Sequence, residues 1–356
     1  MLLFQGLDRF FLNEKSFVNN PVRLVIVFYR TSVQGSDRLK TISKINHVFM
    51  YLPPKISKAV RAVSKCGLDN TQEIRLRRGK KVSLVISSKE YFLEPGGILS
   101  NSFEKALDVT DEDIKQITEF AFQSSVHSFG KEITRGYITV QGGCRIGFCG
   151  TAVINSKEQF SIETIKDISC INIRIAREVI GCADEIMGSI VPEISAGLLI
   201  CGAPSSGKTT LLRDLTRQLG NKYTVSLIDE RNEIASVYES AAQNDVGLKT
   251  DVFASYNKYD GIITAVKVMS PVYLVCDEIG CREDIKALEY AINSGVKLIA
   301  TCHSPSLDKV RSKPVIKKLI KHGAFDRLVF LGTGNRCGKI MSVCDLKTEE
   351  RIHRYA

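Results

Sequence analysis

The sequence predicts an α/β protein in which a parallel sheet flanked by helices follows a smaller α+β N-terminal domain. Beyond residue 197, apolar strand patterns alternate with helical patterns, and that alternation is typical of a parallel sheet with helical crossovers. Apolar residues make up 44% and charged residues 25% of the chain, as in ordinary globular proteins, which excludes a disordered or fibrous class. The strands expected in the parallel sheet are 197–201, 223–228, 272–276 and 297–301.

With 356 residues the chain is long enough for two domains, and we expect three segments. Residues 1–49 show little periodicity and are interpreted either as an N-terminal extension or as the result of a misassigned start codon. Residues 50–180 are expected to form the α+β domain, because two prolines after Met50 suit the first turn of a helix. Residues 181–356 are expected to form the second domain, with 176–198 as the connection.

The first domain is expected to combine short strands with one amphipathic helix. Residues 73–77 and 81–86 alternate in polarity on either side of a glycine-containing turn, which predicts two paired strands. Residues 111–126 begin with acidic residues and place apolar residues at helical spacing, which predicts a helix. Further strands are expected at 136–140, 145–149 and 171–175.

Residues 202–209, GAPSSGKT, match the phosphate-binding pattern G-x-x-x-x-G-K-[ST] between an apolar strand and a helical pattern. There, backbone N–H groups and the helix N-terminus surround a nucleotide's phosphates, while a lysine reaches the β- and γ-phosphates. A chance match in a Gly/Ser turn is the competing interpretation, and the setting disfavours it. With ATP and Mg²⁺ as cofactors, the expected binding residues are Gly202, Ala203, Pro204, Ser205, Ser206, Gly207, Lys208 (also catalytic), Thr209 (also a metal ligand) and Thr210.

Two carboxylates follow the expected strand at 272–276. Asp277 is predicted to hold Mg²⁺ through water, and Glu278 to polarise the attacking water. The second acid favours hydrolysis over transfer to an organic acceptor. The alternative is an acidic helix N-cap after a core strand.

Polar residues also end two other expected strands. Thr301 or His303, after the strand at 297–301, is placed to sense the γ-phosphate, although a lone histidine is more often structural. Asp229 and Glu230 follow the strand at 223–228 and are predicted to meet the magnesium or a water bound to it. A charged, exposed loop is the alternative for that acidic pair.

Arginines recur in the expected strands of the first domain. An arginine brought to a γ-phosphate from another domain or subunit stabilises transition-state charge and couples hydrolysis to movement. A surface ion pair is the alternative for each of them. The arginines concerned are Arg75, Arg77, Arg135, Arg145, Arg174 and Arg177.

The formal net charge of +10 is concentrated near the C-terminus, where residues 297–356 hold thirteen Lys+Arg against five Asp+Glu. Such a region attracts nucleic acid, anionic lipid or an acidic protein, or is simply a solvated surface. The eleven cysteines lack the paired spacing of a zinc site and are expected to be reduced thiols. The apolar run at 22–29 contains Arg23 and is far shorter than the roughly 20 residues of a membrane span, so no transmembrane helix is expected.

From about Tyr51 onward the chain resembles the stage III sporulation protein AA family of endospore-forming bacteria, which is related to the type II and type IV secretion ATPases. The resemblance rests on a combination of stretches, which is more specific than the phosphate-binding loop alone. They are TQEIRLR at 71–77, GCRIGFCG at 143–150, INIRIARE at 171–178, GAPSSGKTT at 202–210, IDERNE at 228–233, CDEIG at 276–280 and TCH at 301–303.

The resemblance implies a RecA-like P-loop NTPase core in which Asp229 and Glu230, Asp277 and Glu278, and His303 serve catalysis. It also implies that Arg145 and Arg174 reach the nucleotide from a neighbouring position. Such enzymes are typically hexameric rings whose domains close on ATP.

The resemblance further implies an ATPase in the mother-cell cytoplasm that docks on membrane-embedded channel proteins at the outer forespore membrane. Two other classes stay open. A nucleic-acid-stimulated ATPase is compatible with the charge, but no basic stripe interleaves with stacking aromatics, so nucleic acid is not the expected partner. An assembly scaffold that binds ATP with little turnover is the non-enzymatic alternative.

Overall fold

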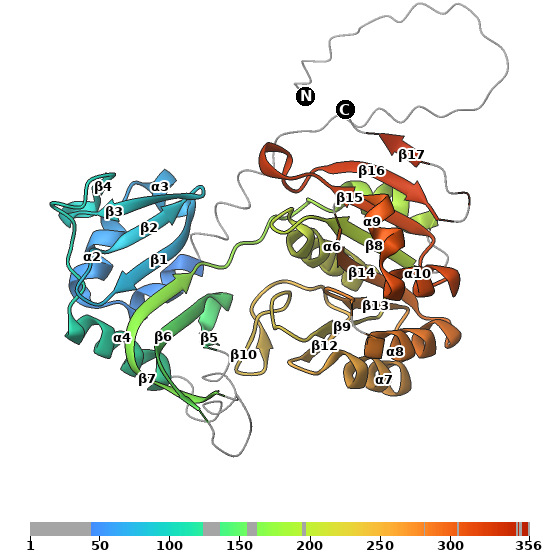
Figure 1. The fold of residues 1–356 in the computed structure, drawn as a ribbon, viewed down its shortest axis with the longest axis horizontal. Coiled ribbons are helices and arrows are strands. Elements are labelled where there is room, and N and C mark those ends of the chain that lie inside the picture. The colour runs from blue at the N-terminus through green and yellow to red at the C-terminus, as the bar shows by residue number, and fades with distance from the viewer. Residues whose placement is uncertain are drawn as a thin grey trace, which may run out of the picture. The chain divides into compact units, whose positions relative to one another are not determined.

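The structure is a computed structural model that describes residues 44–123, 136–154, 162–193, 197–280, 282–304, 306–346, 348 and 351–354. These residues form a seven-stranded sheet, an eight-stranded sheet and a two-stranded ribbon (Figure 1). The larger sheet and its helices have the predicted α/β architecture, and the smaller sheet precedes it in the chain as expected.

The N-terminal sheet is antiparallel throughout, with the strand order β4-β3-β2-β1-β7-β6-β5. The predicted pairing of two strands around the turn at Gly79 is confirmed by β1 and β2. The prediction missed β3 and β4. The strands are β1 Thr71–Arg77, β2 Ser83–Ile86, β3 Lys89–Leu93, β4 Leu99–Ser100, β5 Tyr137–Thr139, β6 Arg145–Ile154 and β7 Ile162–Arg174.

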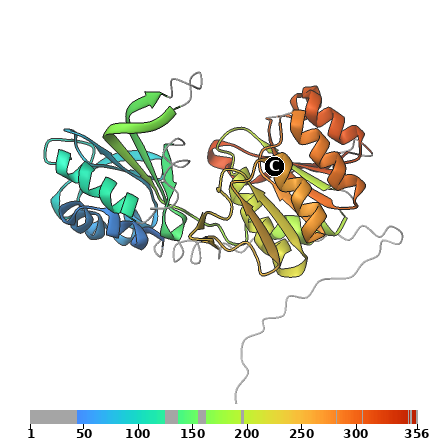
Figure 2. The ribbon, with the colours of Figure 1, turned by 90° about the horizontal axis from the view of Figure 1, so that it is seen from below.

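One face of this sheet packs against helices α2 (Pro54–Ala62) and α4 (Asp111–Gln123), which Figure 2 shows in blue and teal on the same side. Both helices were predicted, and the last three residues of the predicted 111–126 helix lie outside the described residues. Because side chains alternate along a strand, Ile74 and Leu76 of β1 enter the core. Glu73 and the strand arginines therefore lie on the opposite, polar face.

The packed chain begins ahead of Met50. Residues 44–48 are helical, and Ile45 and Val48 are fully buried in the same core as α2 and α4. The short helix α3 (Lys65–Asp69) follows α2. Whether residues 1–49 as a whole are an extension stays a prediction, and residues 1–43 lie outside the described residues.

The C-terminal sheet has the order β12-β9-β13-β14-β8-β15-β16-β17. Neighbours from β12 to β15 pair in parallel, and β16 and β17 pair antiparallel at one edge. The four predicted strands are confirmed, whereas the other four were missed. The strands are β8 Gly197–Gly202, β9 Val225–Asp229, β12 Thr250–Ala254, β13 Tyr273–Cys276, β14 Lys297–His303, β15 Arg327–Leu331, β16 Ile340–Asp345 and β17 Arg351–Arg354.

Helices cover both faces of this sheet, which explains its continuous apolar runs. On β8, Leu199 packs with α7, α8, α9 and α10, whereas Leu198 packs with α6 and the turn at 186–190. The second half of the predicted connection at 176–198 therefore belongs to the core of this domain. The helices are α6 Lys208–Lys222, α7 Lys258–Met269, α8 Arg282–Asn293, α9 Leu307–Ser312 and α10 Pro314–Lys321.

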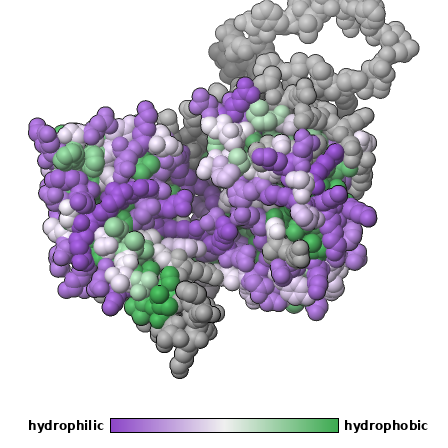
Figure 3. All heavy atoms as spheres, in the orientation of Figure 1, coloured by the Kyte–Doolittle hydropathy of each residue, from purple (hydrophilic) through white to green (hydrophobic). Residues whose placement is uncertain are grey.

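The face of the molecule in Figure 3 is mostly hydrophilic, with scattered apolar patches. Across the described ranges no helix combines the length and apolarity that a bilayer crossing requires.

Candidate nucleotide-binding site

The predicted phosphate-binding loop connects β8 to α6, and its glycines are required by local geometry. Gly207 precedes α6 in a left-handed conformation with φ +89°. A Cβ at Gly202 would lie 2.3 Å from Ser206 Oγ, so a larger residue would displace the loop. Parallel strands β8, β13, β14 and β9 end at the same edge of the sheet, which brings the residues after them to this loop.

Lys208, the first residue of α6, folds back onto the loop. Its Nζ donates to the carbonyls of Gly202 at 3.0 Å and Ala203 at 2.8 Å. Burial lowers the pKa of Lys208, and the charges of Asp277 and Glu278 oppose that shift. The ammonium group thus lies within the loop, with two backbone carbonyls as its hydrogen-bond acceptors.

Thr209 and Asp277 provide oxygen ligands of the kind that Mg²⁺ takes. The Thr209 hydroxyl donates to Asp277 Oδ2 at 3.0 Å, and the Thr301 hydroxyl donates to Oδ1 of the same carboxylate. A carboxylate at the end of β13 next to the hydroxyl that begins α6 fits a magnesium ion beside bound phosphates. The sequence predicted that Thr209 and Asp277 lie at the magnesium site, and in the structure their side chains are in contact.

The rest of the loop contacts a segment that sequence analysis did not connect to it. The backbone N–H of Gly338 donates to the carbonyl of Ser206 at 2.9 Å, and the Cys337 thiol contacts the carbonyl of Ser205. This segment precedes β16 at the antiparallel edge. No motif marks it, because one backbone N–H and one thiol make the contacts and only the strand order brings them to the loop.

Glu278 follows Asp277 with the unusual backbone angle φ +48°. Its carboxylate pairs with Arg231 Nη1 at 3.0 Å through Oε2 and lies 3.3 Å from His303 Nε2 through Oε1. Its N–H donates to the Thr301 hydroxyl at 2.8 Å. The structure thus joins the predicted Glu278 and His303, and adds Arg231, which sequence analysis had read only as part of a motif.

Asp229 is placed differently from the prediction that it meets the magnesium or its water. It is buried, and its carboxylate accepts hydrogen bonds from the backbone N–H groups of Glu233 at 2.8 Å, Ile234 at 3.0 Å and Ala235 at 2.8 Å. Burial raises the pKa of Asp229, and the nearby Asp277 charge adds to the effect. Asp229 therefore shapes the loop at 230–237, which we call the acidic loop.

A pocket opens between the acidic loop and the end of β13. Glu230 lies in it, 3.6 Å from the ammonium of Lys258, the first residue of α7. Sequence analysis missed Lys258, because a single lysine far from any motif carries no local signal. The pocket is lined by Asp229, Glu230, Arg231, Glu233, Lys258, Asp277 and Glu278.

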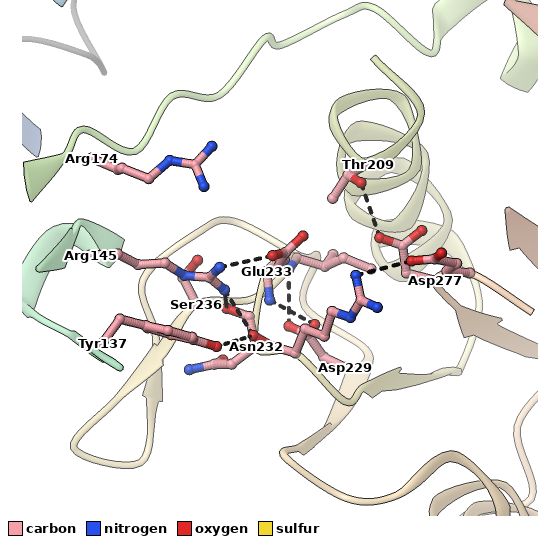
Figure 4. Close-up of polar contacts among 12 residues, drawn as sticks. Tyr137, Arg145, Arg174, Thr209, Asp229, Asn232, Glu233, Ser236 and Asp277 are labelled. Carbon is pink, nitrogen blue, oxygen red and sulfur yellow. Dashed lines mark hydrogen bonds and ion pairs between the residues drawn. The ribbon is translucent and has the colours of Figure 1, made fainter. Parts of the chain in front are cut away.

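Arg145 of β6 binds the acidic loop of its own chain. Its guanidinium contacts Glu233 Oε1 and the carbonyls of Arg231 and Asn232, each at 2.8 Å, and lies over the ring of Tyr137. Figure 4 shows Arg145 and Tyr137 directed at this loop, with Arg174 apart from them. The contact of Arg145 with a nucleotide from a neighbouring position stays a prediction.

Arg174 pairs across the polar face of the N-terminal sheet. Its side chain is 66% exposed, and its Nε lies 3.7 Å from Glu73 Oε1. In the strand register Arg174 faces Glu73 on β1 and Arg145 on β6. The exposure of Arg174 is compatible with the predicted contact with a nucleotide, and that contact stays a prediction.

Two cations outside the motifs connect segments near the acidic loop that are distant in sequence. Arg213 of α6 donates to the carbonyls of Glu233, Ile234 and Arg177, and burial lowers its pKa. Lys44 donates to Glu178 and to Asn244. It thereby links the start of the packed chain to the segment after β7 and to the segment before β12. Arg213 therefore joins α6 directly to the acidic loop.

The fold and the site together define a P-loop NTPase with a RecA-like core. The chain belongs to the stage III sporulation protein AA family: the family model described as "Sporulation stage III, protein AA" matches residues 43–351. It is 30% identical over 307 residues to stage III sporulation protein AA of Bacillus subtilis, covering 85% of this chain and 95% of that protein. It is also 30% identical over 150 residues to SEEDLING PLASTID DEVELOPMENT 1 of Arabidopsis thaliana, covering 41% of this chain and 22% of that protein.

A solved structure of a pilus retraction motor shares the architecture. The pilus retraction motor PilT with bound ADP matches 77% of this chain and 76% of its own with a TM-score of 0.51 at 12% identity. The Legionella pneumophila ATPase DotB matches 78% and 77% with a TM-score of 0.49 at 14% identity. The likeness to PilT shows the fold of this chain and not its activity.

Proposed function

We propose that this protein is a Mg²⁺-dependent ATP hydrolase that works as a motor. One observation carries the proposal: Thr209 of the phosphate-binding loop is hydrogen-bonded to Asp277, and Glu278 follows directly with its backbone held by Thr301. A hydroxyl, a carboxylate and a second carboxylate at this point of a parallel sheet are the groups that ATP hydrolysis requires.

In this proposal each residue acts on the phosphates or on water. Lys208 leaves the loop carbonyls and binds the β- and γ-phosphates, while Thr209 and Asp277 hold Mg²⁺, which neutralises charge on the phosphates. Glu278 accepts a proton from the attacking water. His303, 3.3 Å from that carboxylate, responds to the position of Glu278 and so to the state of the γ-phosphate.

The motor is proposed to assemble as a ring, with six subunits as the expected number, and to dock on membrane-embedded channel proteins during endospore formation. Membership of the sporulation family supports the cellular setting. Its place would be the cytoplasm of the mother cell, at the outer forespore membrane. The basic side chains Lys317, Lys318 and Lys321 of α10 are exposed and offer the docking surface.

The test is steady-state ATP hydrolysis by the full chain beside Lys208→Ala and Glu278→Gln. We expect a loss of about 100-fold or more in kcat for each variant, because each removes a group that acts in the transition state. Glu278→Gln should retain ATP binding and ring assembly, measured by fluorescent-nucleotide titration and by mass. ATP-dependent assembly of a wild-type protein that does not hydrolyse ATP would contradict the enzyme and establish a nucleotide-gated scaffold.

A further inference from the structure

Lys258 is buried where a positive charge is unfavourable. It is the first residue of α7, and its side chain is 9% exposed. A helix N-terminus carries the positive end of the helix dipole and favours anions, and burial adds a desolvation cost for an ammonium group. A lysine at this position therefore depends on strong compensating contacts.

Those contacts come from the segment that follows β13. Lys258 Nζ donates to the carbonyl of Glu278 at 2.7 Å and lies 3.8 Å from Asp284 Oδ2. Asp284 is itself buried and accepts a hydrogen bond from the N–H of Gly280 at 3.1 Å. Lys258 and Asp284 thus hold the turn after β13 from two sides, and Glu230 adds a second carboxylate, 3.6 Å from the Lys258 ammonium.

The turn needs such support because Glu278 adopts φ +48°, a region that costs free energy for a residue with a side chain. Its N–H is bonded to the Thr301 hydroxyl and its carbonyl to Lys258, so side chains from β14 and α7 hold both of its backbone polar groups. In this conformation the Glu278 carboxylate enters the pocket and meets Arg231.

We infer that Lys258 is a positioning residue for Glu278: its ammonium group holds the carbonyl of Glu278 and so keeps the carboxylate directed into the pocket. This inference rests on the proposed ATP hydrolysis, in which Glu278 receives the proton of the attacking water. Lys258 takes no part in proton transfer, and its contribution passes through the geometry of Glu278.

The first test compares Lys258→Met with Lys267→Met, an exposed lysine in the last turn of the same helix. For Lys258→Met we expect kcat to fall about 10- to 100-fold with KM within about twofold, because a misplaced base slows the chemical step but leaves the phosphate-binding loop intact. Lys267→Met should match the wild type. A wild-type kcat in a folded Lys258→Met protein would overturn the inference.

The second test asks whether Lys258 acts through Glu278. Added to Glu278→Gln, Lys258→Met should produce no further loss of kcat, since the group that it positions is already absent. The same fold loss on both backgrounds would contradict a positioning role. Lys258→Arg, which keeps the cation, should recover part of the loss, and an arginine variant as slow as the methionine variant would contradict a cationic hold.

A crystal structure of Lys258→Met tests the geometry without turnover, so it separates this inference from the proposed function. Glu278 at negative φ would support the inference, and an unchanged φ near +48° would overturn it. Should Lys258→Met fail to fold, Lys258→Gln, whose amide is too short to reach the carbonyl, serves in the same comparisons. Absence of hydrolysis by the wild-type protein would instead contradict the proposed function alone.

Discussion

Asp229 ends β9 with both carboxylate oxygens bonded to backbone N–H groups of the acidic loop. At the level of the residue, sequence position suggested that Asp229 meets the magnesium or a water bound to it, because the carboxylate follows an apolar strand. The structure assigns those oxygens to three N–H donors, which would otherwise lack partners in a buried place. One side chain thus decides the shape of a loop that carries Glu230, Arg231 and Glu233 into the pocket.

Asp229→Ala is expected to reduce the free energy of unfolding by about 3 kcal/mol. The reason is that each buried N–H group that loses its acceptor carries a desolvation cost of about 1–3 kcal/mol. Partial relaxation of the loop offsets part of the sum. Chemical denaturation measures the change. Glu104→Ala, at an exposed position of the first domain, is the control and should stay within about 0.5 kcal/mol of the wild type. An equally stable Asp229→Ala protein would show that the loop is held by its other contacts.

At the scale of elements, the acidic loop is the part of the site that the two sheets share. Arg145 of β6 binds it through Glu233 and two carbonyls, and Arg213 of α6 binds it from the opposite side. A planar guanidinium with several donors suits such a cluster of oxygens, and lysine does not replace it. The loop therefore links α6, the helix that begins at Lys208, with the antiparallel sheet.

Arg145→Ala should loosen the acidic loop, seen as faster amide hydrogen exchange over residues 230–237. The reason is the simultaneous loss of three 2.8 Å hydrogen bonds. Arg174→Ala is the matched control, because this arginine pairs with Glu73 and should leave exchange in the loop unchanged. Equal exchange in both variants would mean that Arg145 does not hold the loop in solution.

In the molecule as a whole, the antiparallel N-terminal sheet contacts the acidic loop of the C-terminal domain through Arg145. The C-terminal sheet carries the phosphate-binding loop at the ends of its parallel strands, and α10 presents exposed lysines while its apolar side chains Val315, Ile316 and Leu319 are buried in the core. The basic face of α10 is therefore available to a partner without unfolding the helix.

Replacement of Lys317, Lys318 and Lys321 by glutamate should abolish recruitment to membranes that contain the partner channel proteins and leave ATP hydrolysis unchanged. The expected cause is loss of electrostatic attraction, so recruitment of the wild type should weaken as salt is raised. Cosedimentation with membranes measures it. The charge-matched control replaces three exposed lysines of the first domain, Lys65, Lys80 and Lys105, by glutamate. Equal recruitment of both variants would contradict docking through α10.

The local signals in the sequence were sufficient for the sheet core and the nucleotide loop. The four strands at β8, β9, β13 and β14 are continuous apolar runs because both faces of the sheet are covered, and such runs are visible in sequence. β12 has a weaker pattern with one buried residue, whereas β15 is also a continuous apolar run and was overlooked. One rule predicted where four site residues lie: the ends of parallel strands share one edge of the sheet. These residues are Thr209, Asp277, Glu278 and His303.

The sequence by itself determined the phosphate-binding loop, the carboxylates after β13 and the family, since each depends on residues close together in the chain. Tertiary structure alone decided that Asp229 shapes a loop, that Arg145 binds that loop within its own chain and that Lys258 supports the backbone of Glu278. The physical reason is that these contacts join segments distant in sequence, often through backbone carbonyls and N–H groups. Every residue carries such groups, so no residue type marks them until folding brings the segments together.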